Sequence, residues 1–111
     1  MPKLATTPFE VSQSLVVLGE RIRTARIRRR ISQAELAKTC QIARRTLYSI
    51  EEGASGIAIG HVLTVLWALG LLPTVDAVAN PDTDEHGKTL EAARRARRAR
   101  HPASNADSND F

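Results

Sequence analysis

The sequence of 111 residues has little of what a disulfide-bonded or membrane protein needs. Its single cysteine, Cys40, has no second cysteine to pair with, which excludes an internal disulfide and suits a reducing compartment. No apolar run is long enough to span a bilayer, and the N-terminus lacks the pattern of a signal peptide. We therefore expect a cytoplasmic protein with no membrane partner.

Catalytic and metal-binding constellations are also missing. The histidines His61, His86 and His101 are too scattered to predict a metal site, and Cys40 fits a small core residue. No Gly-rich loop of the GxxxxGK type could hold a phosphate. The sequence therefore predicts a protein that is not an enzyme and that uses no metal or cofactor.

The distribution of charge says more than the net charge of +4. Residues 1–80 carry ten Lys/Arg against six Asp/Glu, whereas residues 81–111 carry six of each. The second stretch is acidic at both ends and basic between them. A basic domain with an arginine surplus fits a polyanion such as DNA, although charge alone would equally fit RNA or an acidic protein surface.

Residues 32–53, SQAELAKTCQIARRTLYSIEEG, predict two short helices joined by a tight turn. Ser32 and Glu35 form the pattern of a capping box at the start of the first helix. The second helix spans residues 43–52 and ends at Gly53, a favourable residue after a helix. Apolar side chains face inward from both helices: Leu36, Ala37, Cys40, Leu47 and Ile50.

The second of these helices leaves a face of hydrogen-bond donors with one aromatic ring. That face consists of Arg44, Arg45, Thr46, Tyr48 and Ser49. A helix with two arginines at its N-terminal end can enter the DNA major groove and reach guanine edges or phosphates. A solvated helix on an ordinary bundle is the alternative, but spacing, caps and charge together favour DNA.

The segment resembles the helix-turn-helix of the Cro and phage-repressor (XRE) family. The matching positions are Ser32, Gln33, Leu36, Ala37, Ile42, Arg44, Thr46, Leu47, Ile50, Glu51 and Gly53. The resemblance implies an all-α, five-helix bundle of the phage-repressor DNA-binding type, acting as a homodimer on a palindromic operator in double-stranded DNA. Three residues depart from the family pattern: Arg30 and Gln41 replace glycines, and Ala43 replaces the serine cap of the second helix.

The resemblance also implies roles for individual residues. Gln33 would bind a backbone phosphate and support the first recognition residue, while Arg44 and Arg45 would read bases. Thr46 would touch a thymine methyl group or a phosphate, and Tyr48 and Ser49 would add base or phosphate contacts. Arg26 would pair with Glu51 and brace the two helices against each other.

The chain divides into a loose arm at residues 1–11, a helix-turn-helix domain at 12–79 and a polar, Arg-rich tail at 80–111. We expect the first helix to begin near Ser12 or Ser14 and to end at about Arg29. A fourth helix should span residues 58–69, and residues 74–79 should form a short fifth helix, with a short strand as the alternative. Residues 89–101 should be disordered or transiently helical, and this flexible basic tail could clamp DNA, engage an acidic partner or keep the chain soluble.

The fourth helix is apolar on nearly every side, which predicts burial on more than one face. Its expected inward stripe consists of Ile59, Val62, Leu63 and Leu66. Trp67 either covers the small core or forms an apolar patch with Leu71. The resemblance places dimerisation in the fifth helix, where Val75 and Val78 should face inward, so Trp67, Leu71, Val75 and Val78 are the predicted dimer or partner interface.

A narrower resemblance is to the HipB branch of small antitoxins. It rests on LGERIRTAR at residues 18–26, VLWALGLL at residues 65–72 and a short domain followed by an Arg-rich tail. It implies a HipA-like kinase toxin as partner and repression of the protein's own operon. The alternatives are a stand-alone regulator of the same fold, or a protein- or RNA-binding adaptor that has lost operator binding.

Overall fold

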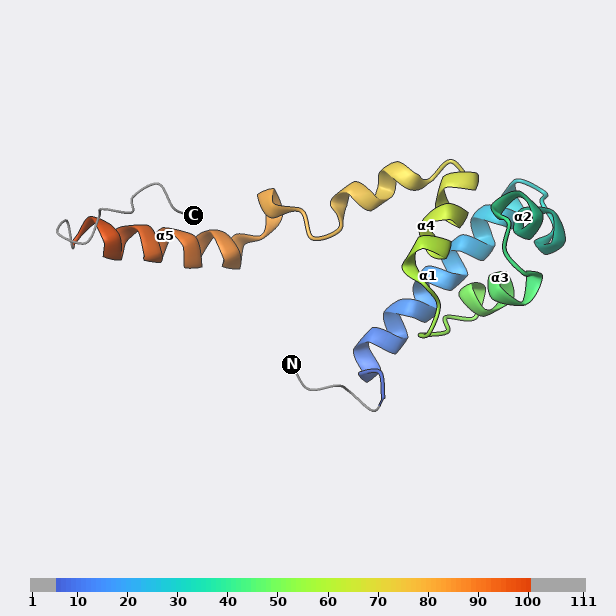
Figure 1. The fold of residues 1–111 in the computed structure, drawn as a ribbon, viewed down its shortest axis with the longest axis horizontal. Coiled ribbons are helices and arrows are strands. Elements are labelled where there is room, and N and C mark those ends of the chain that lie inside the picture. The colour runs from blue at the N-terminus through green and yellow to red at the C-terminus, as the bar shows by residue number, and fades with distance from the viewer. Residues whose placement is uncertain (1–5, 101–111) are drawn as a thin grey trace. The chain divides into compact units, whose positions relative to one another are not determined.

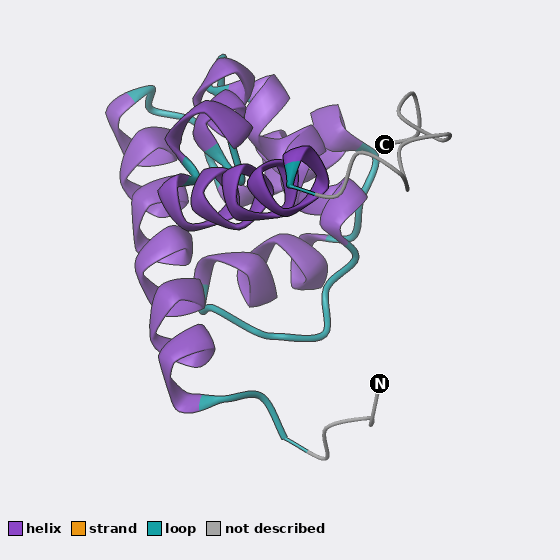
Figure 2. Cartoon of the chain, turned by 90° about the vertical axis from the view of Figure 1, so that its left-hand side faces the viewer, coloured by secondary structure: helices purple, strands orange, loops and turns teal. Residues whose placement is uncertain are grey.

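The computed structural model describes residues 6–100, and every regular element in this range is a helix (Figures 1 and 2). The elements are α1 (Phe9–Arg28), α2 (Gln33–Cys40), α3 (Arg44–Glu51), α4 (Ile59–Ala68), the 3-10 helices η1 (Leu72–Ala77) and η2 (Pro81–Thr83), and α5 (Glu85–Ala99). The all-α prediction is confirmed. The chain divides into two compact units, with the division after Val75. The outer parts of the predicted arm and tail, residues 1–5 and 101–111, lie outside the described residues.

The first helix begins at Phe9, earlier than the expected start at Ser12 or Ser14. No side chain caps it; instead Pro8 precedes its first residue, and the Pro8 carbonyl accepts a hydrogen bond from the Ser12 amide at 3.0 Å. The expectation was wrong because it looked for a serine cap, whereas the bend at Pro8 sets the start. Phe9 to Val11 therefore belong to α1 and not to a loose arm.

The predicted capping box of α2 is confirmed. Ser32 Oγ accepts from the Glu35 amide at 3.0 Å, and Glu35 Oε1 accepts from the Ser32 amide at 2.8 Å. The Ser32 backbone amide, and after it the Ser32 hydroxyl, stabilises the charged carboxylate, so the pKa of Glu35 lies below its ordinary value. Ala43 stands at the corresponding position of α3 and provides no side-chain cap.

Four helices end in the same left-handed turn, in which one amide bonds the carbonyl five residues earlier. Gly53 and Gly70 supply the positive φ after α3 and α4, at 83° and 77°. Arg30 (φ 55°) and Gln41 (φ 57°) do so after α1 and α2. A side chain makes this conformation costly, so both departures from glycine place strain beside the helix-turn-helix.

The core of the first unit joins α1 to α4. Its buried apolar residues are Ile22, Ala25, Leu36, Ala37, Cys40, Leu47, Ile50, Val65, Leu66 and Leu69. The backbones of α1 and α3 approach closely at Gly19, where an added Cβ would lie 2.5 Å from the carbonyl oxygens of Ile50 and Glu51. The main chains of α1 and α3 are therefore in direct contact.

The buried face of α4 differs from the expected stripe. Val65 and Leu69 are buried, whereas Ile59 is 74% exposed. Ile59 is the first residue of α4 and lies between the exposed Ala58 and Gly60, whereas Ile57 and Val62 pack against the core. The inward stripe therefore begins one turn later than the sequence suggested.

The segment after Gly70 forms η1 in place of the expected helix at residues 74–79. Val75 is half-buried against the core, but Val78 is 70% exposed. The expectation that Val78 faces inward is wrong, because η1 ends at Ala77 and the positive φ of Ala79 (54°) turns the chain just after Val78.

The second unit, described from residue 76 to 100, contains η2 and α5. Asn80 Oδ1 accepts from the Asp82 amide at 2.9 Å, and Asp84 Oδ1 caps α5 by accepting from the Gly87 amide at 3.0 Å. The high helix propensity of alanine and arginine accounts for a helix where we expected disorder or transient helicity. No residue of α5 is buried. Within residues 6–100, no helix combines the length and apolar content needed to cross a membrane.

Candidate nucleic-acid interface

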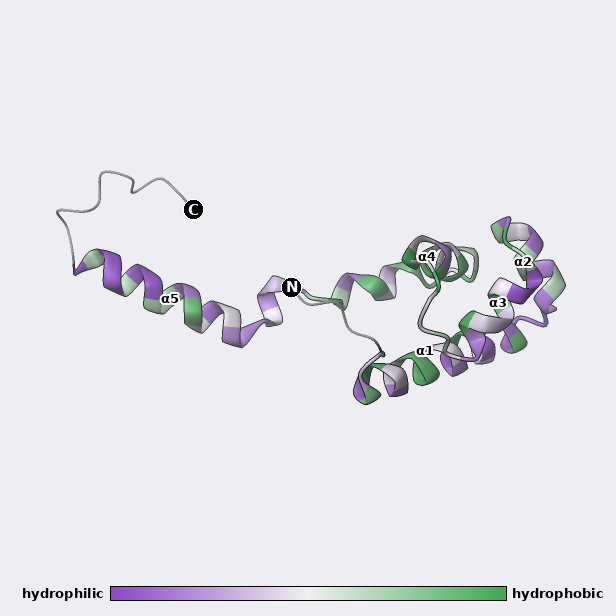
Figure 3. Cartoon of the chain, turned by 60° about the horizontal axis from the view of Figure 1, so that its bottom comes forward, coloured by the Kyte–Doolittle hydropathy of each residue, from purple (hydrophilic) through white to green (hydrophobic). Residues whose placement is uncertain are grey.

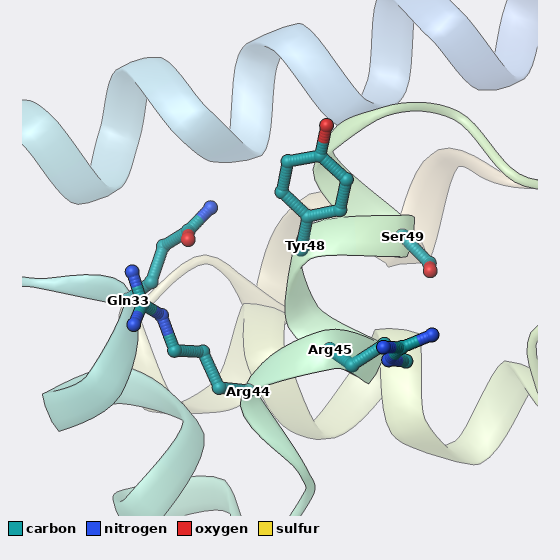
Figure 4. A pocket seen from close by; sticks show the side chains of 5 residues that line it. All are labelled: Gln33, Arg44, Arg45, Tyr48 and Ser49. Carbon is teal, nitrogen blue, oxygen red and sulfur yellow. The ribbon is translucent and has the colours of Figure 1, made fainter.

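Five residues from α2 and α3 line one open hollow of about 580 Å³ on the first unit (Figure 4). They are Gln33, Arg44, Arg45, Tyr48 and Ser49. All five were predicted from the sequence as DNA contacts. The sixth predicted residue, Thr46, is half-buried and does not line the hollow.

Arg44 and Arg45 occupy the first turn of α3 and are both exposed. Figure 4 shows their side chains diverging, that of Arg44 extending toward Gln33 and that of Arg45 away from it. Neither side chain has a hydrogen-bond or ion-pair partner among residues 6–100. No acidic residue lies in this turn, and Ala43 leaves it without a side-chain cap. The N-terminus of α3 therefore presents two free cations beside uncapped backbone amides, which favours an anion.

The ion pair that the resemblance implied joins Arg26 of α1 to Glu51 at the end of α3. Arg26 Nε lies 2.7 Å from Glu51 Oε2, and Nη2 lies 3.0 Å from Oε1. A third guanidinium nitrogen, Nη1, donates to the Ile31 carbonyl at 2.9 Å. Both side chains are buried, at 11% and 1% exposed, so this two-point contact ties α1 to α3 away from solvent.

Gln33 takes part in the same network, which the sequence did not reveal. Its Nε2 donates to Glu51 Oε1 at 3.0 Å. A buried carboxylate can accept about four hydrogen bonds, and Arg26 donates only two to Glu51. The remaining acceptor sites of Glu51 are the signal from which a further donor could have been predicted. Because the amide nitrogen has two hydrogens, Gln33 retains one for an outside acceptor.

The predicted dimer or partner residues differ in exposure and in the unit to which they belong. Trp67 is 57% exposed, so it does not cover the core. Leu71 and Val75 are half-buried against that core, and Val78 belongs to the second unit. Of the four residues, Trp67 alone presents a large side chain to solvent from α4, a helix that is mostly hydrophobic in Figure 3.

Cys40 and the histidines show no metal chemistry in the described part of the chain. No group of three His, Cys, Asp or Glu side chains among residues 6–100 could hold an ion. Cys40 lies in the core with Sγ 3.8 Å from the Thr64 carbonyl oxygen, and burial raises the pKa of its thiol.

A comparison with protein families matches residues 22–73 to helix-turn-helix domains. This segment is similar to XRE-type helix-turn-helix domains. It begins within α1, contains α2, α3 and α4 entirely, and ends within η1. The match supports a DNA-binding transcription regulator, a class of protein that is generally not enzymatic. The search of curated proteins found no match for the chain.

Proposed function

We propose that this chain is a sequence-specific transcriptional repressor that inserts α3 into the DNA major groove. The proposal rests on the hollow lined by Gln33, Arg44, Arg45, Tyr48 and Ser49, in which both arginine side chains are unpartnered among residues 6–100. Guanine O6 and N7 accept the paired donors of an arginine, so Arg44 and Arg45 read bases. Their divergence lets one helix turn address two positions along the groove.

The surrounding residues position α3 on the backbone. Gln33 donates its remaining amide hydrogen to a phosphate, and Ser49 and Tyr48 bond to a phosphate or base edge. The half-buried Thr46 contributes a peripheral contact to a thymine methyl group or a phosphate. The uncapped amides at the start of α3 attract a phosphate directly.

Glu51 would oppose DNA binding if its charge faced the groove. Instead, the carboxylate is buried and accepts hydrogen bonds from Arg26 and Gln33. The network therefore removes a negative charge from the DNA-facing side and holds the end of α3 against α1. These two effects support assigning Arg26 and Glu51 a structural role.

The repressor acts as a symmetric homodimer, so its operator should be a palindrome with half-sites about one helical turn apart. Selection from a random duplex library with the full chain should recover such a site. Replacing Arg44 with Ala should then cost about 1–3 kcal/mol, roughly 5- to 150-fold in affinity, and relax preference at one base pair. If Arg44→Ala and Arg45→Ala both leave operator affinity unchanged, the groove assignment is wrong.

We further propose that the chain is a HipB-like antitoxin that binds a HipA-like kinase and represses its own operon in the cytoplasm. The sequence resemblance supports this, together with the exposed Trp67, an aromatic side chain of the kind that anchors protein interfaces. Co-purification of the full chain with the kinase encoded beside it should yield a complex that Trp67→Ala weakens. A neighbouring gene of another type would favour a stand-alone regulator, and absence of any preferred duplex would favour an adaptor.

A further inference from the structure

The second unit carries strongly separated charge. Residues 76–91 contain five acidic residues and one basic residue, whereas residues 94–100 contain five arginines and no acidic residue. The arginines occupy the last two turns of α5 and the residue after it, and all are exposed. They are Arg94, Arg95, Arg97, Arg98 and Arg100. Positive charge therefore covers more than half of the circumference of this helical end.

The local ion pairs of α5 do not neutralise this arginine run. Lys88 Nζ lies 3.5 Å from Glu85 Oε2, and Arg95 Nη2 lies 3.2 Å from Glu91 Oε2. The side chains of Arg94, Arg97 and Arg100 have no such partner within the described range 6–100. At least three guanidinium groups are therefore available to an outside anion.

The helix offers little to a partner that binds by apolar contact. Its opposite face carries the small residues Ala92, Ala93, Ala96 and Ala99, and Leu90 is its one large exposed apolar residue. Hydrophilic residues dominate α5 in Figure 3. Nor does the helix dipole account for the whole run, because that effect falls off within the last turn and Arg94 and Arg95 precede it. The C-terminal turns of α5 therefore offer a partner mainly positive charge.

We propose that the C-terminal turns of α5 bind backbone phosphates of duplex DNA, as a second and sequence-independent site. This inference rests on the proposed function, since it assumes that α3 engages the same duplex. A planar guanidinium matches two phosphate oxygens at once, and each phosphate neutralised releases condensed counterions. Because α5 is tethered to the helix-turn-helix through residues 69–84, its binding to the same duplex is intramolecular and adds to the affinity.

The test measures how affinity depends on salt, using the full chain and a random-sequence 30-base-pair duplex. In one variant Arg94, Arg97 and Arg100 become Ala, and in its matched control the same three become Lys. If each arginine neutralises one phosphate, the Ala variant loses about 2.7 from the slope of log affinity against log salt. The full chain should then lose about 40-fold more affinity than the Ala variant between 50 and 200 mM salt. The Lys control keeps the charge and should keep the slope.

Two results would overturn this inference. One is an Ala variant whose slope equals that of the full chain; the other is a Lys control that loses as much as the Ala variant. Circular dichroism checks that α5 persists, as expected because Ala and Lys are both strong helix formers. Binding of poly-glutamate that the Ala variant loses, with the duplex slope unchanged, would assign the run to an acidic protein surface.

A failure of the proposed operator binding gives a different result from a failure of the phosphate site on α5. The Arg44→Ala, Arg45→Ala double variant removes base contacts but leaves α5 intact. If the chain prefers no duplex sequence, the proposed operator binding fails while the slope on random duplex still tests α5. If operator preference is lost only in the α3 variant and the slope changes only in the α5 variant, both assignments hold.

Discussion

The amide of Gln33 donates to the same carboxylate oxygen of Glu51 that accepts from Arg26, with both contacts at 3.0 Å. One residue predicted to meet DNA is thereby joined to the ion pair that holds α3 on α1. Because the shared acceptor is buried, a change at Gln33 alters both the DNA-facing surface and the stability of the fold.

Replacing Gln33 measures the second of these effects, its contribution to the stability of the fold. Gln33→Ala removes one hydrogen bond to a charged group and should lower the free energy of unfolding by about 1.5–3 kcal/mol in urea titrations. Gln33→Glu places a second carboxylate beside Glu51 and should cost more at pH 7 than at pH 4, where carboxyl groups begin to protonate. Equal stability of both variants and the parent protein would show that the contact contributes nothing.

The Arg26–Glu51 ion pair should dominate the stability of the domain. Glu51→Gln leaves the buried guanidinium without its counter-charge and should cost about 3–5 kcal/mol, measured by chemical unfolding. Glu52→Gln is the matched control, because Glu52 is adjacent and exposed, and its effect should stay within about 0.5 kcal/mol. A loss below about 1 kcal/mol at Glu51 would refute the bracing role.

A glycine at position 41 should make the left-handed turn after α2 more stable. Gln41→Gly removes the steric penalty of a side chain at φ 57° and should raise stability by up to about 1 kcal/mol, even though glycine makes the unfolded chain more flexible. Lys38→Gly, inside α2, should instead lower stability by about 1 kcal/mol. Thermal unfolding of the two variants gives opposite shifts if the turn is strained as described.

The backbone contact at Gly19 should tolerate no side chain. Gly19→Ala drives a Cβ against the carbonyl oxygens of Ile50 and Glu51 and should cost about 1–3 kcal/mol. Gly60→Ala is the control, since Gly60 lies in α4 with nothing within 4 Å of the added carbon. That substitution should stabilise the domain by about 0.5–1 kcal/mol, and two losses of similar size would disprove the close approach.

The capping box should make stability depend on acid pH. Ser32 depresses the pKa of Glu35 in the folded state, so the contribution is complete above the unfolded value of about 4.3 and is lost as the pH falls through the lower folded value. Urea midpoints of the parent protein and Glu35→Gln should therefore converge as the pH is lowered from 7 to 3. A gap that stays constant over this range would argue against a charged cap.

Local chemistry made part of the fold predictable. Ser32 and Glu35 define a capping box within four residues, and Gln41, which replaces a family glycine, adopts the left-handed conformation that favours glycine. Contacts across the fold were harder to predict. The hydrogen bond from Gln33 to Glu51 depends on where two helices meet, and Ile59 fits the helical period of α4 but finds no neighbour to bury it.

The packing of α3 against α1 has a consequence for how the sequence of such a protein can evolve. The contacts that hold the helix are the buried side chains of Leu47 and Ile50, a main-chain approach at Gly19 and the carboxylate of Glu51 at its far end. None of them uses the side chains at positions 44, 45, 48 and 49, which line the outer hollow. Those four positions can therefore be substituted without disturbing the packing of α3. After gene duplication, the two proteins could acquire different DNA target sequences while keeping the same fold.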